Sequence, residues 1–112
     1  MEKSLASLNS ATRRQVLEEA LMAGALIIEG RSKMNAPVNT GYLRNSIQAQ
    51  PGPGTSQSAE AIISVGADYG AAVEFGTSRQ PAQSYLRTAI DTTESQVSSV
   101  IIDHIQDSIK KA

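Results

Sequence analysis

The stretch that decides the fold class is SIQAQPGPGTSQSAEAIISVGA, residues 46–67. Over 59–67, apolar and polar residues alternate, and a period of two indicates a half-buried strand. The apolar side of this strand carries Ala61, Ile63 and Val65. A weaker alternation over 46–50 indicates a second strand. Because the residues between them are rich in Pro and Gly, we predict an antiparallel hairpin with a long flexible loop at 51–58.

A helix is predicted on each side of this hairpin. From about residue 10 to residue 33, apolar residues recur at helical spacing, and Pro37 ends the segment. A second apolar stripe repeats every three or four residues over 83–112. Gly24 lies on the stripe of the first helix, where the close approach of another backbone would explain a glycine.

The remaining segments are short. Thr40 can cap a helical turn through residues 42–44. Residues 71–75 fit either a third strand or a short helix, because so short a segment does not decide between the two. We expect residues 76–82 to form a second flexible loop, and residues 1–9 to form an arm or a short docking element.

The chain of 112 residues suits one domain over 1–112. The order of its elements predicts an α+β fold, in which a small antiparallel sheet packs against a long N-terminal helix and a C-terminal helix. With 40% apolar residues, one Phe and no Trp, we expect a thin core of Ile, Val, Leu and Ala. The longest apolar stretch, residues 20–28, is shorter than the roughly 20 residues of a membrane span, so neither membrane contact nor an export signal is expected.

The composition also excludes several kinds of site. A formal charge of -1 argues against a domain that grips the phosphate backbone of nucleic acid. The absence of cysteine excludes disulfides, thiolate zinc sites and cysteine nucleophiles. His104 is the sole histidine, and beside Asp103 and Asp107 it fits a surface position on a helix better than a metal site. Asp68 and Glu74 could form a carboxylate pair, but solvated carboxylates are far commoner. We therefore expect no enzyme activity, cofactor or metal.

Three segments carry a resemblance to a known family. They are APVNTGYLRNSI at 36–47, DYGAAVEFGT at 68–77 and QPAQSYLRTA at 80–89. In this order and spacing they resemble the head–tail joining (tail-completion, or neck) proteins of long-tailed double-stranded DNA phages. The chain departs from the family pattern at Asn39, where Asp is usual, and at Ser84 and Tyr85, where Pro and Phe are usual.

The resemblance implies a structural virion protein that acts as an adaptor between head and tail and assembles into a ring, with six subunits as the expectation. Its partners would be further copies of itself, the connector or head-completion proteins, and the tail-tube or tail-terminator proteins. DNA would only pass through as cargo. The protein would be made in the bacterial cytoplasm and reside in the virion neck. Two alternatives remain open at this point: a small phage or prophage regulator that binds a host or phage protein, and a DNA-binding accessory factor.

The resemblance also singles out a set of interface and structural residues. They are Pro37, Thr40, Gly41, Leu43, Arg44, Tyr69, Glu74, Phe75, Gly76, Thr77, Pro81, Tyr85, Leu86 and Arg87. Gly41 and Gly76 permit tight chain reversals, and Phe75 is expected to add aromatic bulk to the core.

Two expectations concern how the last helix begins and what Glu74 does. Ser84 is expected to cap the last helix, and Tyr85 can fill an apolar slot if its hydroxyl finds a partner. Glu74 either pairs with one of three arginines in a ring interface or is a surface carboxylate beside a turn. The three candidates are Arg44, Arg79 and Arg87.

Overall fold

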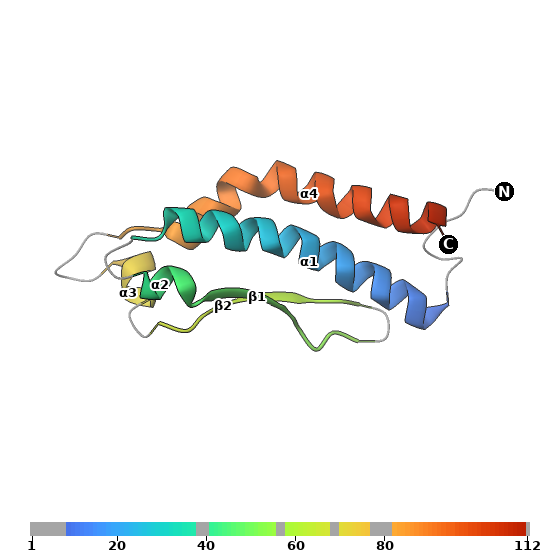
Figure 1. Ribbon diagram of the computed structural model, residues 1–112, viewed down its shortest axis with the longest axis horizontal. Coiled ribbons are helices and arrows are strands. Elements are labelled where there is room, and N and C mark those ends of the chain that lie inside the picture. The colour runs from blue at the N-terminus through green and yellow to red at the C-terminus, as the bar shows by residue number, and fades with distance from the viewer. Residues whose placement is uncertain (1–8, 38–40, 56–57, 68–69, 77–81, 112) are drawn as a thin grey trace.

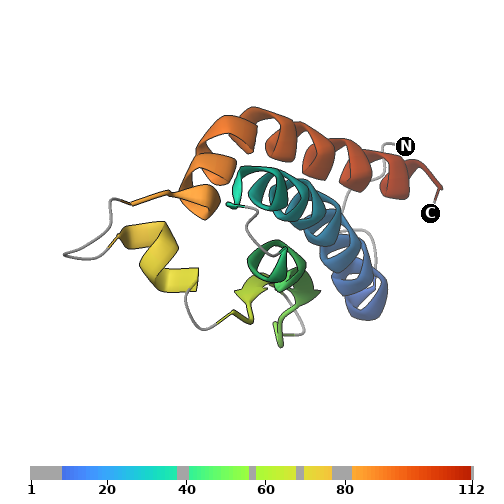
Figure 2. The same ribbon diagram turned by 60° about the vertical axis from the view of Figure 1, so that its left-hand side comes forward.

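The computed structural model describes residues 9–37, 41–55, 58–67, 70–76 and 82–111. Its elements follow one another as α1 (Ser10–Asn35), α2 (Tyr42–Asn45), β1 (Ile47–Pro51), β2 (Ala61–Val65), α3 (Gly70–Phe75) and α4 (Tyr85–Lys111). The expected α+β class is therefore confirmed. The molecule is elongated, with extents of 61 × 25 × 22 Å. Helix α1 lies between the sheet and α4, and makes the main helical contact with the strands (Figures 1 and 2).

Local signals explain where α1 begins and ends. The Asn9 side chain accepts a hydrogen bond of 2.8 Å from the Thr12 amide, which satisfies one of the free donors of the first turn. At the other end, Ala36 leaves the helix with an extended backbone. The residue before a proline is pushed out of the helical region, so Pro37 ends α1 as predicted.

The predicted hairpin is present, and β1 and β2 pair antiparallel with Ile47 opposite Val65 and Ala49 opposite Ile63. Ile47 is fully buried on the inner face of the sheet, where Ala49, Ile63 and Val65 are half-buried, whereas Ile62 is exposed on the outer face. At the hairpin tip, Gly52 donates to the Glu60 carbonyl and Thr55 to the Ser58 carbonyl, both at 2.9 Å.

The contact between α1 and α4 depends on small residues. Ala20 and Ala89 have no exposed surface. A side chain at Gly24 would place its Cβ 2.9 Å from Ile101 Cδ1 and 3.0 Å from Val97 Cγ1. A close approach at Gly24 was predicted, but the expected partner was wrong, because the glycine makes room for side chains of α4 and not for another backbone.

A second cluster lies where α1 ends and α4 begins. It contains Ala36, Leu43, Ile47, Ala67 and Tyr85, all at most 5% exposed. As expected, the core is thin, because only three of the nine buried apolar residues in the described ranges are larger than valine. Residues 71–75 form the helical alternative, within α3, so the sheet has two strands among the described residues.

Candidate functional site

The segments that carry the family resemblance converge on one end of the molecule. Here α1 ends, α4 begins, and the short helices α2 and α3 are both found (Figure 1). We call this region the motif end, and the region around the loop between β1 and β2 the hairpin-tip end. Ten singled-out residues lie at the motif end: Pro37, Gly41, Leu43, Arg44, Glu74, Phe75, Gly76, Tyr85, Leu86 and Arg87. Four others, Thr40, Tyr69, Thr77 and Pro81, lie outside the described residues.

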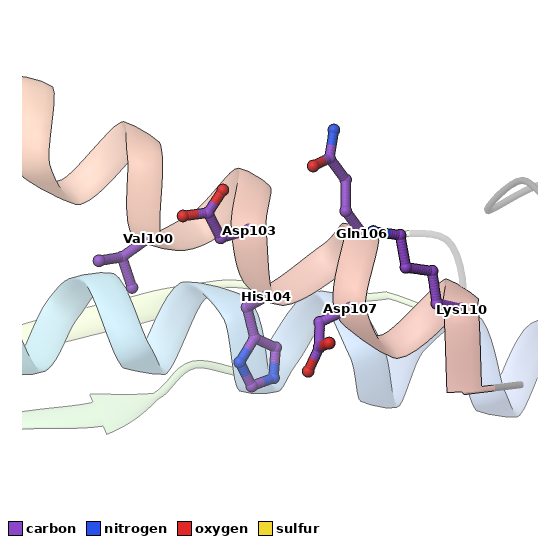
Figure 3. Close-up of a pocket in the computed structure, with 6 residues that line it drawn as sticks. All are labelled: Val100, Asp103, His104, Gln106, Asp107 and Lys110. Carbon is purple, nitrogen blue, oxygen red and sulfur yellow. The ribbon is translucent and has the colours of Figure 1, made fainter.

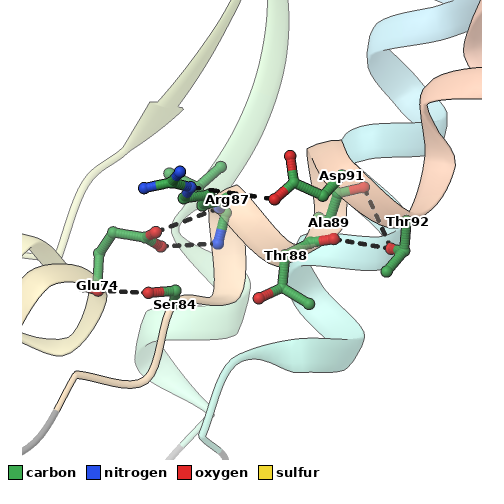
Figure 4. A network of polar contacts seen from close by, with 8 residues as sticks. Glu74, Ser84, Arg87, Thr88, Ala89, Asp91 and Thr92 are labelled. Carbon is green, nitrogen blue, oxygen red and sulfur yellow. Dashed lines mark hydrogen bonds and ion pairs between the residues drawn. The ribbon is translucent and has the colours of Figure 1, made fainter.

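Glu74 joins α3 to the start of α4. Its side chain is 5% exposed, and its two carboxylate oxygens accept hydrogen bonds of 2.7 Å from the Leu86 amide and 3.2 Å from the Arg87 amide (Figure 4). These amides belong to the first turn of α4, where no carbonyl of the same helix can pair with them. A negative charge at a helix N-terminus is also favourable toward the helix dipole. Glu74 is therefore the cap of α4, provided from another element.

This arrangement corrects the expectation for Ser84. A serine just before a helix ordinarily caps the amides two and three residues later. Here Glu74 binds those amides, and the Ser84 hydroxyl instead donates to the Glu74 carbonyl at 3.0 Å (Figure 4). Side chain and backbone of Glu74 are thus both tied to the start of α4.

Of the two expectations for Glu74, the surface carboxylate is wrong, and the pairing with an arginine across a ring interface stays a prediction. It is buried, so it is no surface carboxylate. Arg44 donates through Nε to the Lys33 carbonyl at 2.9 Å, and the exposed Arg87 guanidinium lies 4.0 Å from Asp91. Within one subunit, neither guanidinium is paired with Glu74, and Arg79 lies outside the described part of the chain. The preference of a buried carboxylate for nearby amide donors explains the outcome.

Tyr85 adds a second buried link between α3 and α4. Its ring is 2% exposed, and its hydroxyl donates a 2.9 Å hydrogen bond to the Gly70 carbonyl, so the partner that this residue needed is present. Burial raises the pKa of Tyr85 above its ordinary value, and the negative charge of Glu74 raises it further by a smaller amount. A Cβ at Gly70 would lie 2.7 Å from Val65 Cγ1. The close approach of α3 to β2 at this position therefore requires glycine.

The two glycines at the chain reversals behave as expected. Gly41 has a φ of 77° and Gly76 a φ of 79°, which lie in the left-handed region that favours glycine. Gly41 occupies the residue before α2 and caps it without a side-chain hydrogen bond. Leu43, in the turn that follows, is 2% exposed and belongs to the core cluster.

Phe75 contradicts the expectation that it fills the core. It is 79% exposed at the end of α3, because the face of this short helix that turns inward is occupied by Glu74 and Gly70. Beside it lies a groove of ≈ 380 Å³. The groove is lined by Glu74, Phe75, Ala82, Ser84, Leu86, Arg87 and Ile90. Exposed apolar side chains around a groove are typical of contact surfaces between proteins.

The hairpin-tip end carries a more polar hollow. Val100, Asp103, His104, Gln106, Asp107 and Lys110 line a space of ≈ 480 Å³ along α4 (Figure 3). His104 Nε2 lies 3.6 Å from Glu19 Oε2, which gives this histidine a structural place between α4 and α1. Among the described residues, no group of acidic or histidine side chains could hold a metal ion. The carboxylate pair considered from the sequence includes Asp68, which lies outside them.

The chain was compared with known proteins. A family model described as "Bacteriophage HK97-gp10, putative tail-component" matches residues 1–76. The match includes α1, the hairpin and α3, with the first segment of the resemblance and nearly all of the second, and stops before α4. No curated protein and no solved structure gives a significant match. No helix in the described ranges is both long and apolar enough to span a bilayer.

Proposed function

Because the chain belongs to the HK97-gp10-like family of bacteriophage tail components, we propose that it is a structural adaptor at the interface of head and tail. In this role it assembles into a ring in the neck of the virion and catalyses no reaction. The ring has six subunits, to match the symmetry expected of the tail. Its neighbours are the connector or head-completion proteins on one side and the tail-tube or tail-terminator proteins on the other.

The exposed position of Phe75 on a fixed helix is the observation that supports this proposal most directly. Glu74 and Tyr85 hold α3 against α4 through buried hydrogen bonds, so Phe75 is presented in one position next to the groove. A rigid, exposed aromatic loses little conformational entropy when a partner covers it, and aromatic residues are enriched among the contacts that dominate binding. Ile90, 47% exposed, extends the apolar surface along α4.

A closed ring needs a heterologous contact, in which one face of each subunit meets a different face of its neighbour. The groove beside Phe75 provides one such face on a single side of the molecule. DNA passes through the ring as cargo, and a net charge of -1 suits a surface that must not retain it.

The elongated shape gives the adaptor two separate ends. The motif end carries the groove, and the described residues of loop 51–58 lie at the hairpin-tip end of a molecule 61 Å long. In the proposed ring the two ends contact different neighbouring proteins, and loop 51–58 binds one of these proteins. Shortening this loop is expected to leave the fold intact and to block the joining of heads to tails.

Phe75→Asp in the full chain tests the proposal, with Ile102→Asp as the matched control. Ile102 is an exposed residue of α4 outside the groove, at 53% exposure, so both changes replace an exposed apolar side chain by a charge. Light scattering coupled to size exclusion, with negative-stain imaging, measures ring formation of the purified protein over a wide concentration range. Complementation of a phage that lacks this gene measures the yield of joined, infectious particles.

We expect Phe75→Asp to prevent ring formation and to leave separate heads and tails, while Ile102→Asp behaves like the wild type. A normal yield of infectious particles from Phe75→Asp would refute the role of the groove. Normal particles in the complete absence of the protein would refute the adaptor function itself.

A further inference from the structure

The two strands of the hairpin differ in whether the backbone groups on their outer edges are protected from pairing with a further strand. The register places Gly66 and Gly52 as donors to the carbonyls of Ser46 and Glu60, so even-numbered residues of the two strands bond each other. The backbone groups of the odd-numbered residues therefore point away from the partner strand. A two-stranded sheet has two such edges, and each can accept a further strand.

The edge of β1 is closed by two features. The outward amide of Ala49 donates to Glu29 Oε1 of α1 at 3.1 Å. Two residues further on, Pro51 has no amide hydrogen to offer. Helix α1 also contacts β1 more than β2, so a strand added at this edge would have to displace the Glu29 contact.

The edge of β2 has neither feature. Within the described ranges, nothing binds the outward amides of Ala61, Ile63 and Val65. The strand AIISV contains no charged residue and no proline, which are the usual means of protecting an exposed edge from other strands. Ile63 and Val65 pack against the core cluster, and Val65 lies next to Gly70 of α3, yet all three inward side chains are only half-buried, so part of this apolar surface is left for a partner to cover.

We propose that the β2 edge pairs with β2 of a second copy of this chain, antiparallel and about a two-fold axis through Ile63. In this register Ile63 lies opposite Ile63 of the second copy, and Ala61 lies opposite Val65 of the second copy. Every outward amide then meets an outward carbonyl, and the two hairpins become one four-stranded sheet. The half-buried side chains of both copies form a continuous apolar layer on the inner face.

The sequence of β2 makes a second copy a suitable occupant. The strand is self-complementary, because the apolar residues of the inner face lie opposite one another and no like charges meet. Sheets of three or more strands are also more stable than an isolated hairpin. The contact is closed by its symmetry, so it forms a dimer of the free protein and is independent of the proposed ring.

Sedimentation velocity on the full chain, from micromolar to near-millimolar concentration, tests this inference with Ala61→Pro. The outward amide of Ala61 makes no bond inside the hairpin, and proline is tolerated as the first residue of a strand, so the variant is expected to keep its fold. Pro51→Ala is the control, because it makes the reciprocal change on the closed edge of β1. Circular dichroism confirms that both variants fold.

We expect a concentration-dependent dimer for the wild type and for Pro51→Ala, and a dimer weakened about 30-fold for Ala61→Pro, since two backbone hydrogen bonds are lost per dimer. Amide exchange followed by NMR gives a second readout: protection of Ile63 and Val65 should rise with concentration, while Ile62 and Ser64 remain protected throughout. A monomer at every concentration, or an assembly of any size that Ala61→Pro does not weaken, would overturn the inference. A ring unaffected by Ala61→Pro would refute the edge contact and still support the adaptor.

Discussion

The motif end and the hairpin-tip end are stabilised by different kinds of contact. At the motif end, the buried side chains of Glu74 and Tyr85 bind backbone groups of other elements. At the hairpin-tip end, Arg14 donates to the Pro53 carbonyl at 2.7 Å from an exposed position, and His104 Nε2 lies 3.6 Å from Glu19 Oε2, beyond hydrogen-bond distance. Water replaces a broken exposed bond easily, whereas a broken buried bond leaves a polar group without a partner. The motif end is therefore the rigid end, and substitutions at the two ends should differ in effect.

The largest effect is expected from Glu74→Ala, because it removes the buried contacts that make the motif end rigid. The substitution leaves the Leu86 and Arg87 amides without an acceptor and removes a charge from the start of α4. We expect the free energy of unfolding to fall by about 2–3 kcal/mol, measured by urea denaturation.

Glu74→Gln is the matched control for this substitution. It keeps one acceptor oxygen without the charge and should lose about 1 kcal/mol. Equal stability of the wild type and Glu74→Ala would show that the amides do not depend on this carboxylate.

A smaller effect is expected from Tyr85→Phe, which leaves the Gly70 carbonyl without its buried donor. The expected loss is about 1 kcal/mol near neutral pH, again from urea denaturation. The effect of this substitution should also depend on pH. Because the folded-state pKa of Tyr85 is raised, its contribution to stability is fully present below about pH 10, and is lost as the pH rises through the folded-state value. Tyr85→Phe should lack this part of the alkaline loss, and an identical alkaline profile in both proteins would contradict the assignment.

The smallest effect is expected from Arg14→Ala at the hairpin-tip end. Its hydrogen bond to Pro53 is exposed, so the free energy of unfolding should change by no more than about 0.5 kcal/mol. The local consequence should be larger than the global one, with faster amide exchange at the hairpin tip in NMR spectra. A loss of stability as large as that of Glu74→Ala would mean that the two ends do not differ as described.

Periodic patterns predicted the larger elements of the fold correctly. The helical spacing of apolar residues and Pro37 gave α1, and the alternation around Ile63 gave β2 and its inner face. These elements are long enough, or bounded clearly enough, for one face to be apparent in the sequence.

The cap of α4 could not be predicted in this way. The rule for helix N-termini looks at the residue just before the helix, Ser84, whereas the acceptor comes from Glu74 across a loop. The exposure of Phe75 was missed for a related reason. An aromatic residue is usually buried, and the short α3 has too few residues to show which of its faces turns inward.

The contact around Gly24 has a consequence for the synthesis of the protein. Helix α1 leaves the ribosome long before Val97 and Ile101, the α4 side chains that pack against Gly24, have been made. At about 5–20 residues per second, the delay between these segments is roughly 4–15 seconds. Throughout this interval the apolar stripe of α1 that α4 will cover has no partner from α4. Until α4 emerges, this uncovered apolar surface makes the nascent chain prone to aggregation.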